Sequence, residues 1–196
     1  MNAMSLDQIR DAVVASNFED TEKLNAWLDV AIGEPRKLID KALYHCIQGH
    51  KTTPVDGRGY VYLSRLAFLQ GVQESGVQEL LSAAEFVRPN DAFVLFQKGR
   101  EAALRSDIES TLVFWGQSFA MSRTYRDEII NGLAPYIPAP LFIDNFKPDT
   151  EGLTQLFSFY RRKKMMVHAS ITGPLVVQNI INDCLSYTAP SPRDRG

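Results

Sequence analysis

The sequence predicts an all-α protein made of stacked antiparallel helical hairpins, with about nine or ten helices in total. Apolar residues recur three and four positions apart in segment after segment, as they do on the buried side of a helix. Alternation of apolar and polar residues, which would indicate a strand, never extends beyond about four residues. One helix-turn-helix pattern also occurs twice, over residues 57–91 and 92–125. Such repetition is typical of an array in which neighbouring hairpins cover one another.

The N-terminal segment predicts a capped helix. Residues 1–3 are interpreted as the remnant of an expression tag, and residues 4–186 are expected to form a single helical-repeat domain. Ser5 and Gln8 form a capping box that would start a helix over residues 6–16. The residues expected on its buried side are Ile9, Val13 and Val14.

The next two helices are expected to form a hairpin ahead of the repeats. The first runs over residues 21–32 and ends at Gly33, a common helix terminator. Pro35 opens the second, because a proline in the first turn loses no intrahelical hydrogen bond, and the pattern continues to Gly49. Its apolar stripe consists of Leu38, Ile39, Ala42, Leu43 and Cys46. Residues 50–59, which contain one proline and two glycines, are predicted to be a surface loop.

The two copies of the repeat share their turn chemistry. A turn at Gln70–Gly71 separates the helices of the first copy, and a turn at Ser106–Asp107 separates those of the second. Gly71 and Ser106 lie 35 positions apart. Trp115 falls in the apolar stripe of the last helix, and we expect it to be a core residue joining the two repeats. The other members of that stripe are Ile108, Leu112 and Phe119.

Three more helices are predicted after the repeats. The first runs from Thr124 to Leu133 and stops before a proline. A short apolar piece, residues 141–146, follows, and Asp149 begins the next helix. Pro174 is expected to open the last helix. Residues 187–196 are interpreted as a disordered tail, because prolines and charges predominate there.

Composition and charge argue against several classes of partner. The chain has 196 residues, of which 45% are hydrophobic, and a formal net charge of -2. Since a nearly neutral chain has no global field to attract polyanions, no nucleic-acid partner is expected. No apolar run reaches the roughly 20 residues of a membrane span, so no direct membrane insertion is expected. A complete chain would be cytoplasmic, whereas a piece of a larger protein would be compatible with membrane association. Cys46 and Cys184 lie in apolar helical patterns and are predicted to be buried thiols.

The sequence contains no recognisable catalytic or metal-binding motif. His45, Cys46 and His50 come nearest to a ligand cluster, but a closed zinc site needs four ligands and no second pair completes this one. The segment 49–52 lacks the upstream strand and glycine of a phosphate-binding loop. Neither a nucleophile elbow nor an HExxH pattern occurs. We therefore expect a non-catalytic protein with no cofactor and no metal.

Four consecutive cations, Arg161–Lys164, form the only marked charge run. We interpret them as a solvated helix C-terminus, where positive charge complements the helix dipole. An anionic partner is the alternative interpretation.

The repeat pattern over residues 57–125 resembles the tetratricopeptide repeat, whose period is about 34 residues. The resemblance implies a right-handed α-solenoid in which the first helix of each repeat lines a concave groove. Ser64, Lys98 and Arg123 depart from the residues usual in that family. The groove positions that the resemblance implies are Arg58, Val61, Tyr62, Arg65 and Phe68 in the first copy, and Phe93, Phe96, Gln97 and Arg100 in the second.

Arg65 and Arg100 are 35 residues apart and occupy equivalent places in the two copies. Two arginines facing one groove would hold a carboxylate or phosphate bidentately. The alternative is that both extend over a solvated face and have no ligand. The first interpretation predicts a binding module for a protein or peptide ligand that carries acidic groups.

Residues 57–63, 114–119 and 125–130 also resemble the soluble repeat region of bacterial O-antigen ligase-like or polymerase-like membrane proteins. This resemblance implies the soluble part of a cell-surface polysaccharide assembly protein. Two alternatives from other classes stay open. One is an enzyme that uses residues 135–146 as a pocket wall, and the other is a structural oligomerisation module.

Overall fold

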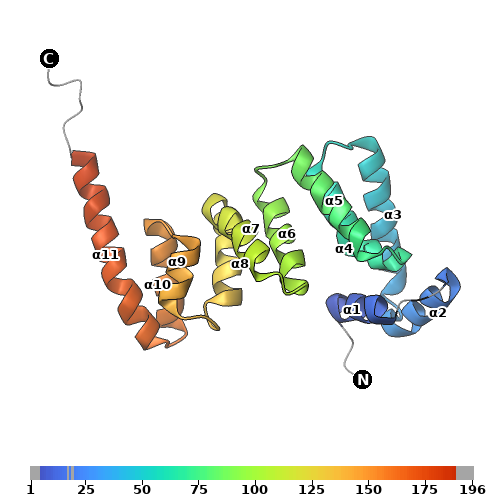
Figure 1. The fold of residues 1–196 in the computed structure, drawn as a ribbon, viewed down its shortest axis with the longest axis horizontal. Helices are drawn as coiled ribbons and strands as arrows, with labels where there is room; N and C mark the ends of the chain where they lie inside the picture. Colours follow the sequence, from blue (N-terminus) through green and yellow to red (C-terminus); the bar gives the residue numbers. More distant parts are fainter. Residues whose placement is uncertain (1–4, 17, 19, 189–196) are drawn as a thin grey trace, which may run out of the picture. The chain divides into compact units, whose positions relative to one another are not determined.

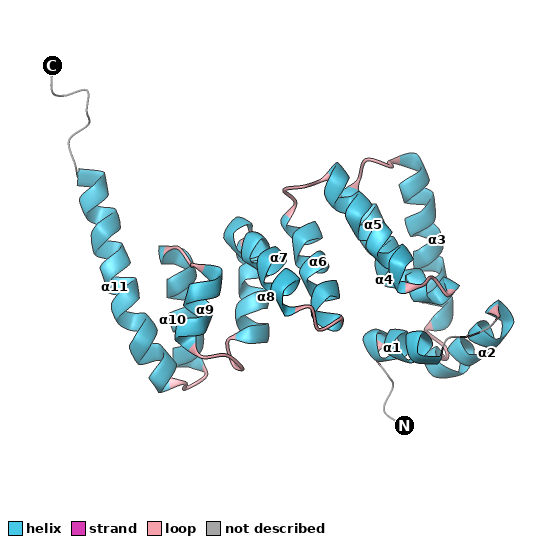
Figure 2. Cartoon of the chain, in the orientation of Figure 1, coloured by secondary structure: helices cyan, strands magenta, loops and turns pink. Residues whose placement is uncertain are grey.

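A computed structural model describes residues 5–16, 18 and 20–188 of the chain. Within this part the chain forms eleven α-helices and one short 3-10 helix, with no strand (Figure 2). The predicted all-α class is confirmed, and the helices exceed the expected number by one or two. The chain divides into two compact units, Met1–Gln97 and Lys98–Gly196, and each is described by itself.

The first unit contains three helices that precede the repeats and the whole of the first repeat. Its elements are α1 (Leu6–Ser16), α2 (Thr21–Ile32), α3 (Arg36–Thr52), α4 (Gly57–Leu66), the 3-10 helix (Ala67–Gln70), α5 (Glu74–Val87) and the start of α6 (Ala92–Leu104), shown in Figure 1. The predicted capping box is present, because Gln8 N donates to Ser5 Oγ at 3.2 Å and Ser5 N donates to Gln8 Oε1 at 2.9 Å. Gly33 ends α2 with a positive φ of 65°, as expected for a glycine terminator.

One core cluster in the first unit joins α1, α2 and α3 to the 3-10 helix. Its buried members are Ile9, Val13, Leu24, Leu28, Leu43, Phe68 and Leu69. Three residues predicted for this core point elsewhere, since Val14 is 57% exposed, Leu38 is 73% exposed and Ala42 is exposed as well. Each lies beside the buried stripe of its helix, so the predicted apolar face was too wide by one position.

The predicted loop over residues 50–59 is present but shorter, because only residues 53–56 lie between helices. Helix α3 continues through Gly49 to Thr52, and α4 already begins at Gly57, capped by the Asp56 side chain, which accepts a hydrogen bond from Arg58 N at 3.2 Å. Gly57 serves packing, because a Cβ there would lie 3.0 Å from Ala84 O of α5. Glycine therefore marks a close helix approach at this place, which the sequence pattern does not distinguish from a loop.

The first repeat forms the predicted helical hairpin. The turn between its helices contains Gly71 in the left-handed region, with φ of 66°. Helices α4 and α5 pack around a second core cluster, whose buried members are Val61, Ala67, Val77, Leu81, Ala84 and Val94. Val94 belongs to α6, the first helix of the second repeat, so the start of α6 packs against the hairpin of the first repeat.

The second unit contains the later turns of α6 and five further helices. These are α7 (Ile108–Met121), α8 (Arg123–Leu133), α9 (Ala139–Phe146), α10 (Thr150–Arg162) and α11 (Met166–Thr188). The predicted turn between the helices of the second repeat is confirmed by Ser106, which has a φ of 61°, and by Asp107, which caps α7. Phe119, Phe142 and Phe146 from α7 and α9 form a buried aromatic core, with ring centroids 4.6–5.9 Å apart.

Trp115 packs against the backbone of α6 in its own hairpin. A Cβ on Gly99 would lie 2.7 Å from Trp115 Nε1 and would also collide with Cδ1. The indole is half-buried, and Ile108 of the same predicted stripe is 62% exposed. Trp115 thus contacts α6, the first helix of the second repeat, at Gly99, where a side chain larger than that of glycine would overlap the indole.

Arg126 of α8 is buried and connects three helices of the second unit. Its Nε donates to Phe119 O of α7 at 3.2 Å, and its Nη1 lies 3.3 Å from both Asp149 Oδ1 and Glu151 Oε2. Asp149 also caps α10 by accepting a hydrogen bond from Gly152 N at 2.7 Å, as its position before the helix predicted. The buried guanidinium therefore donates a hydrogen bond to one carbonyl and pairs with two carboxylates, which balance its charge.

The prediction that Pro174 opens the last helix is wrong, because α11 begins at Met166 and contains Pro174 in its interior. The residue before it is Gly173, whose missing Cβ removes part of the clash that usually ends a helix before proline. Burial of Ala169, Thr172 and Val176 on one side then holds both halves of α11 in a single helix. The helix continues to Thr188, two residues into the predicted tail, and residues 189–196 lie outside the described part.

The two thiols differ from their predicted burial. Cys184 on α11 is exposed, since it lies away from the buried side of that helix. Cys46 on α3 is half-buried, and this burial raises the pKa of its thiol. Neither residue is in a disulfide.

Tyr160 on α10 has no solvent exposure, and its hydroxyl has no hydrogen-bond partner in the described part of the chain. Burial raises the pKa of Tyr160 to about 12, from 10 in an exposed tyrosine. Because the neutral form is favoured in the folded state, this stabilisation is complete below pH 10 and is lost as the pH rises from 10 to 12.

We expect Tyr160→Phe to leave the free energy of unfolding at pH 7 within about 1 kcal/mol of the parent. The variant should unfold at a higher alkaline pH than the parent. Above pH 12 its free energy of unfolding should exceed that of the parent by up to roughly 3 kcal/mol. At pH 11, halfway between the two pKa values, the difference should be roughly 1 kcal/mol. Urea unfolding followed by circular dichroism at pH 7 and pH 11 measures it, and equal alkaline sensitivity would contradict the assignment to Tyr160.

Candidate functional site

The outer side of α4 carries three exposed side chains at helical spacing. Arg58, Tyr62 and Arg65 follow one another at four and three residues, so they share one face of the helix. All three are exposed, and Tyr62 is 44% exposed despite its size. Exposed aromatic and arginine side chains on one face are the residue types enriched at the energetic centres of interfaces.

Tyr62 forms a ring pair with Phe93 on the neighbouring helix. Their ring centroids are 5.6 Å apart and the planes are tilted by 44°. Phe93 lies in the first turn of α6, which is fixed by Asp91, whose Oδ1 accepts from Phe93 N at 2.9 Å and Val94 N at 3.3 Å. The aromatic pair is therefore held by a helix cap on one side and by packed α4 on the other.

Two arginines share the carboxylate that caps α6. Asp91 Oδ2 lies 3.9 Å from Arg58 Nε and 4.0 Å from Arg88 Nη1, so one carboxylate faces two guanidinium groups. The same carboxyl group also accepts the cap hydrogen bonds of α6, which uses part of its hydrogen-bonding capacity. With Arg65 on the face of Tyr62, the arginines outnumber this carboxylate by three to one.

A shallow depression of about 170 Å³ lies beside Tyr62. Its lining residues are Cys46, Gly49, His50, Thr53, Asp56, Gly59 and Tyr62. The His50 ring contacts Tyr60 with centroids 4.3 Å apart, and His50 Nδ1 is buried without a hydrogen-bond partner in the described part of the chain. No group of three or more His, Cys, Asp or Glu side chains among the described residues is arranged to hold a metal ion. His45 of the predicted ligand trio is exposed and does not line the depression.

The structure separates the predicted groove residues into three kinds. Arg58, Tyr62 and Arg65 are exposed, and Phe93 and Phe96 are half-buried. Gln97 is 7% exposed, so its side chain is almost entirely inside, and Arg100 is half-buried in the second unit.

Val61 and Phe68, also placed in the groove by the repeat resemblance, are buried in the two core clusters of the first unit. That part of the prediction is wrong. Because α4 packs against both α3 and α5, only one narrow face of this helix is exposed to a ligand. The sequence analysis did not single out Arg88 and Asp91, which lie in the link between the two copies of the repeat. The Asp91 signal was present, because an Asp directly before an apolar helical run is a preferred N-cap.

Comparisons with protein-family models, with curated proteins and with solved structures found no match to this chain. Among the described residues, no helix is both long enough and apolar enough to cross a membrane. We therefore infer function from the chemistry of the exposed surface. Fixed aromatic rings next to guanidinium groups favour recognition of a ligand with one apolar and one anionic part.

Proposed function

We propose that this protein is a non-catalytic binding module that recognises an acidic segment of a protein or peptide. The binding surface consists of Arg58, Tyr62 and Arg65 on α4 with Phe93 on α6, and we call it the α4–α6 surface. An apolar side chain of the ligand would rest on the Tyr62–Phe93 pair while its carboxylates contact the flanking arginines. The module would be built from tetratricopeptide-like repeats arranged as a right-handed solenoid.

The observation that carries the proposal is the exposed Tyr62, which pairs with the half-buried Phe93 and lies between Arg58 and Arg65 on one face of α4. A tyrosine that remains 44% exposed although it contacts a second ring presents apolar area to a ligand without a large ordering cost. Guanidinium groups add geometric selectivity, because each presents a planar fork that matches a carboxylate.

The second resemblance adds a cellular context to this proposal. If the chain is the soluble part of a cell-surface polysaccharide assembly protein, the acidic segment would belong to another protein of that assembly. This context is part of our proposal.

Arginine chemistry at the α4–α6 surface gives the test. We expect Arg58→Lys combined with Arg65→Lys to weaken binding of an acidic peptide about tenfold, because lysine keeps the charge but loses the bidentate fork. The probe is a synthetic library of Asp- and Glu-rich peptides that each contain one Phe or Leu, titrated by fluorescence anisotropy. The free energy of unfolding of the double variant should stay within about 0.5 kcal/mol of the parent.

The matched control is Arg105→Lys combined with Arg123→Lys, which makes the same exchange at two exposed arginines outside the α4–α6 surface. This control should bind like the parent. Equal weakening by both pairs, or unchanged affinity in Arg58→Lys with Arg65→Lys, would contradict the proposed surface. Loss of stability in the test pair would instead show that these arginines are structural.

A further inference from the structure

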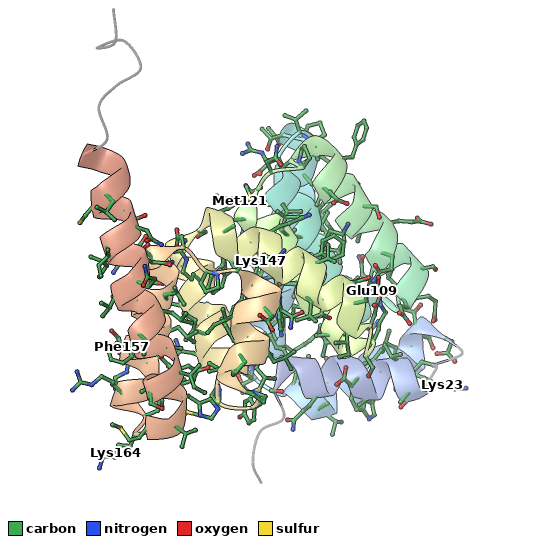
Figure 3. All side chains as sticks on the ribbon, turned by 60° about the vertical axis from the view of Figure 1, so that its left-hand side comes forward. Lys23, Glu109, Met121, Lys147, Phe157 and Lys164 are labelled. Carbon is green, nitrogen blue, oxygen red and sulfur yellow. The ribbon has the colours of Figure 1, made fainter. Side chains whose placement is uncertain are left out.

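We propose that the end of the α10–α11 hairpin in the second unit docks on an anionic lipid surface. The hairpin end consists of the four cations Arg161–Lys164 and the next three residues, Met165, Met166 and Val167. We call it the hairpin tip. Figure 3 shows Lys164 at this end of the two helices, with Phe157 further along α10. The inference is independent of the acidic-peptide proposal, which concerns the first unit and α6.

The backbone of the hairpin tip is fixed by a helix-terminating motif. Met165 N donates to Tyr160 O at 2.9 Å, Lys164 N donates to Arg161 O at 3.1 Å, and Lys164 has a φ of 58°. This is the hydrogen-bond pattern of a Schellman motif with a left-handed residue, although the residue is lysine where glycine is usual. The backbone that carries the cations is thus already ordered, so binding does not have to order it.

The charge at the hairpin tip is uncompensated. All four cations are exposed, and none of them forms an ion pair with a residue in the described part of the chain. The sequence contains no Asp or Glu between Glu151 and Asp183, so neither helix supplies a countercharge near the turn. Arg161 lies over the Phe157 ring at 5.8 Å, a contact that keeps its charge. The carboxylates of this hairpin lie at its other end, where Asp183 accepts from Thr150 Oγ1 at 2.7 Å.

Large apolar side chains project next to this charge. Met166 is 65% exposed and Val167 is 72% exposed, directly after the basic run. A nucleic-acid backbone would use the cations but gain nothing from these two side chains. An anionic bilayer uses both, because lipid phosphates attract the cations and the headgroup boundary accepts the apolar side chains. A turn at the end of two helices is also convex, which suits a flat surface better than an extended peptide.

Vesicle flotation with the full chain tests this inference. We expect binding to vesicles of phosphatidylcholine mixed with phosphatidylglycerol, little binding to phosphatidylcholine alone, and loss of binding at high salt. Arg162→Gln with Lys163→Gln should lower the partition coefficient about thirtyfold, since each cation near an anionic surface contributes roughly a factor of five. The matched control, Lys37→Gln with Lys41→Gln, removes the same charge from two exposed lysines of α3 and should leave binding unchanged.

A second pair of variants separates lipid from other polyanions. Met166→Ser with Val167→Ser should lower vesicle binding roughly tenfold, because it removes apolar area and no charge. Val177→Ser, at another exposed position of α11, is its control and should have no effect. Circular dichroism melting should show that all variants fold like the parent. Failure to bind acidic vesicles, equal loss in the Lys37 and Lys41 control, or binding only to a single-stranded DNA oligonucleotide would overturn the inference.

Discussion

Gly99→Ala is expected to lower the free energy of unfolding by roughly 1–3 kcal/mol, because the new methyl group would overlap the Trp115 indole. The nearest indole atoms include Cγ at 3.0 Å and Nε1 at 2.7 Å from the position of a Cβ. These atoms belong to a rigid ring, so either the indole must leave its place against α6 or the two helices must move apart. Either change loses packing, and urea unfolding measures the cost.

Gly132→Ala in α8 is the matched control, since no atom lies within 4 Å of a Cβ there. Alanine is the better helix former by about 1 kcal/mol, so this variant should be more stable than the parent. Combining Gly99→Ala with Trp115→Leu should recover part of the loss, because the smaller side chain makes room. If Gly99→Ala is instead as stable as Gly132→Ala, the close packing of α6 and α7 in the second repeat is wrong.

Arg126→Ala is expected to cost roughly 2–4 kcal/mol of unfolding free energy. The change removes a side chain that is 5% exposed and that packs over the Phe119 ring at 5.4 Å. It also leaves Phe119 O without its hydrogen bond and removes the partner of Asp149 and Glu151. Thermal unfolding of the purified variant, with the fitted enthalpy, measures this cost.

Arg123→Ala is the control for this prediction, because Arg123 also pairs with Glu151, at 3.7 Å, but its side chain is 75% exposed. Exposed ion pairs contribute little, so this variant should lie within about 0.5 kcal/mol of the parent. Arg126→Met, which keeps most of the buried stem, should fall between the two. Similar stabilities for Arg123→Ala and Arg126→Ala would show that Arg126 does not connect α7, α8 and α10.

Local signals in the sequence predicted most helix boundaries. The capping box at Ser5, the glycine at Gly33 and the acidic cap at Asp149 each satisfy backbone groups that a helix end leaves unpaired, so they act without help from the rest of the fold. The wrong boundaries lie where packing decides. Gly57 and Pro174 have the local chemistry of a loop and of a helix start, yet tertiary contacts place both inside helices.

The candidate site was predictable in part. The resemblance to the tetratricopeptide repeat implied that Arg58, Tyr62 and Arg65 line one groove, and the structure leaves all three exposed. The burial of Gln97 and the arrangement of Asp91 between two arginines depend on how α6 packs against the first repeat. No periodicity within a single helix contains that information.

Backbone and aromatic side-chain NMR of the full chain, titrated with the tightest peptide of the acidic library, tests the proposed binding surface most directly. We predict that the largest shift changes will occur at Arg58, Tyr62, Arg65 and Phe93, with the Tyr62 and Phe93 ring signals moving together. We also predict that Phe→Ala in the peptide will remove the ring shifts. Shift changes concentrated on other helices, with the Tyr62 and Phe93 signals unmoved, would contradict the assignment of the α4–α6 surface.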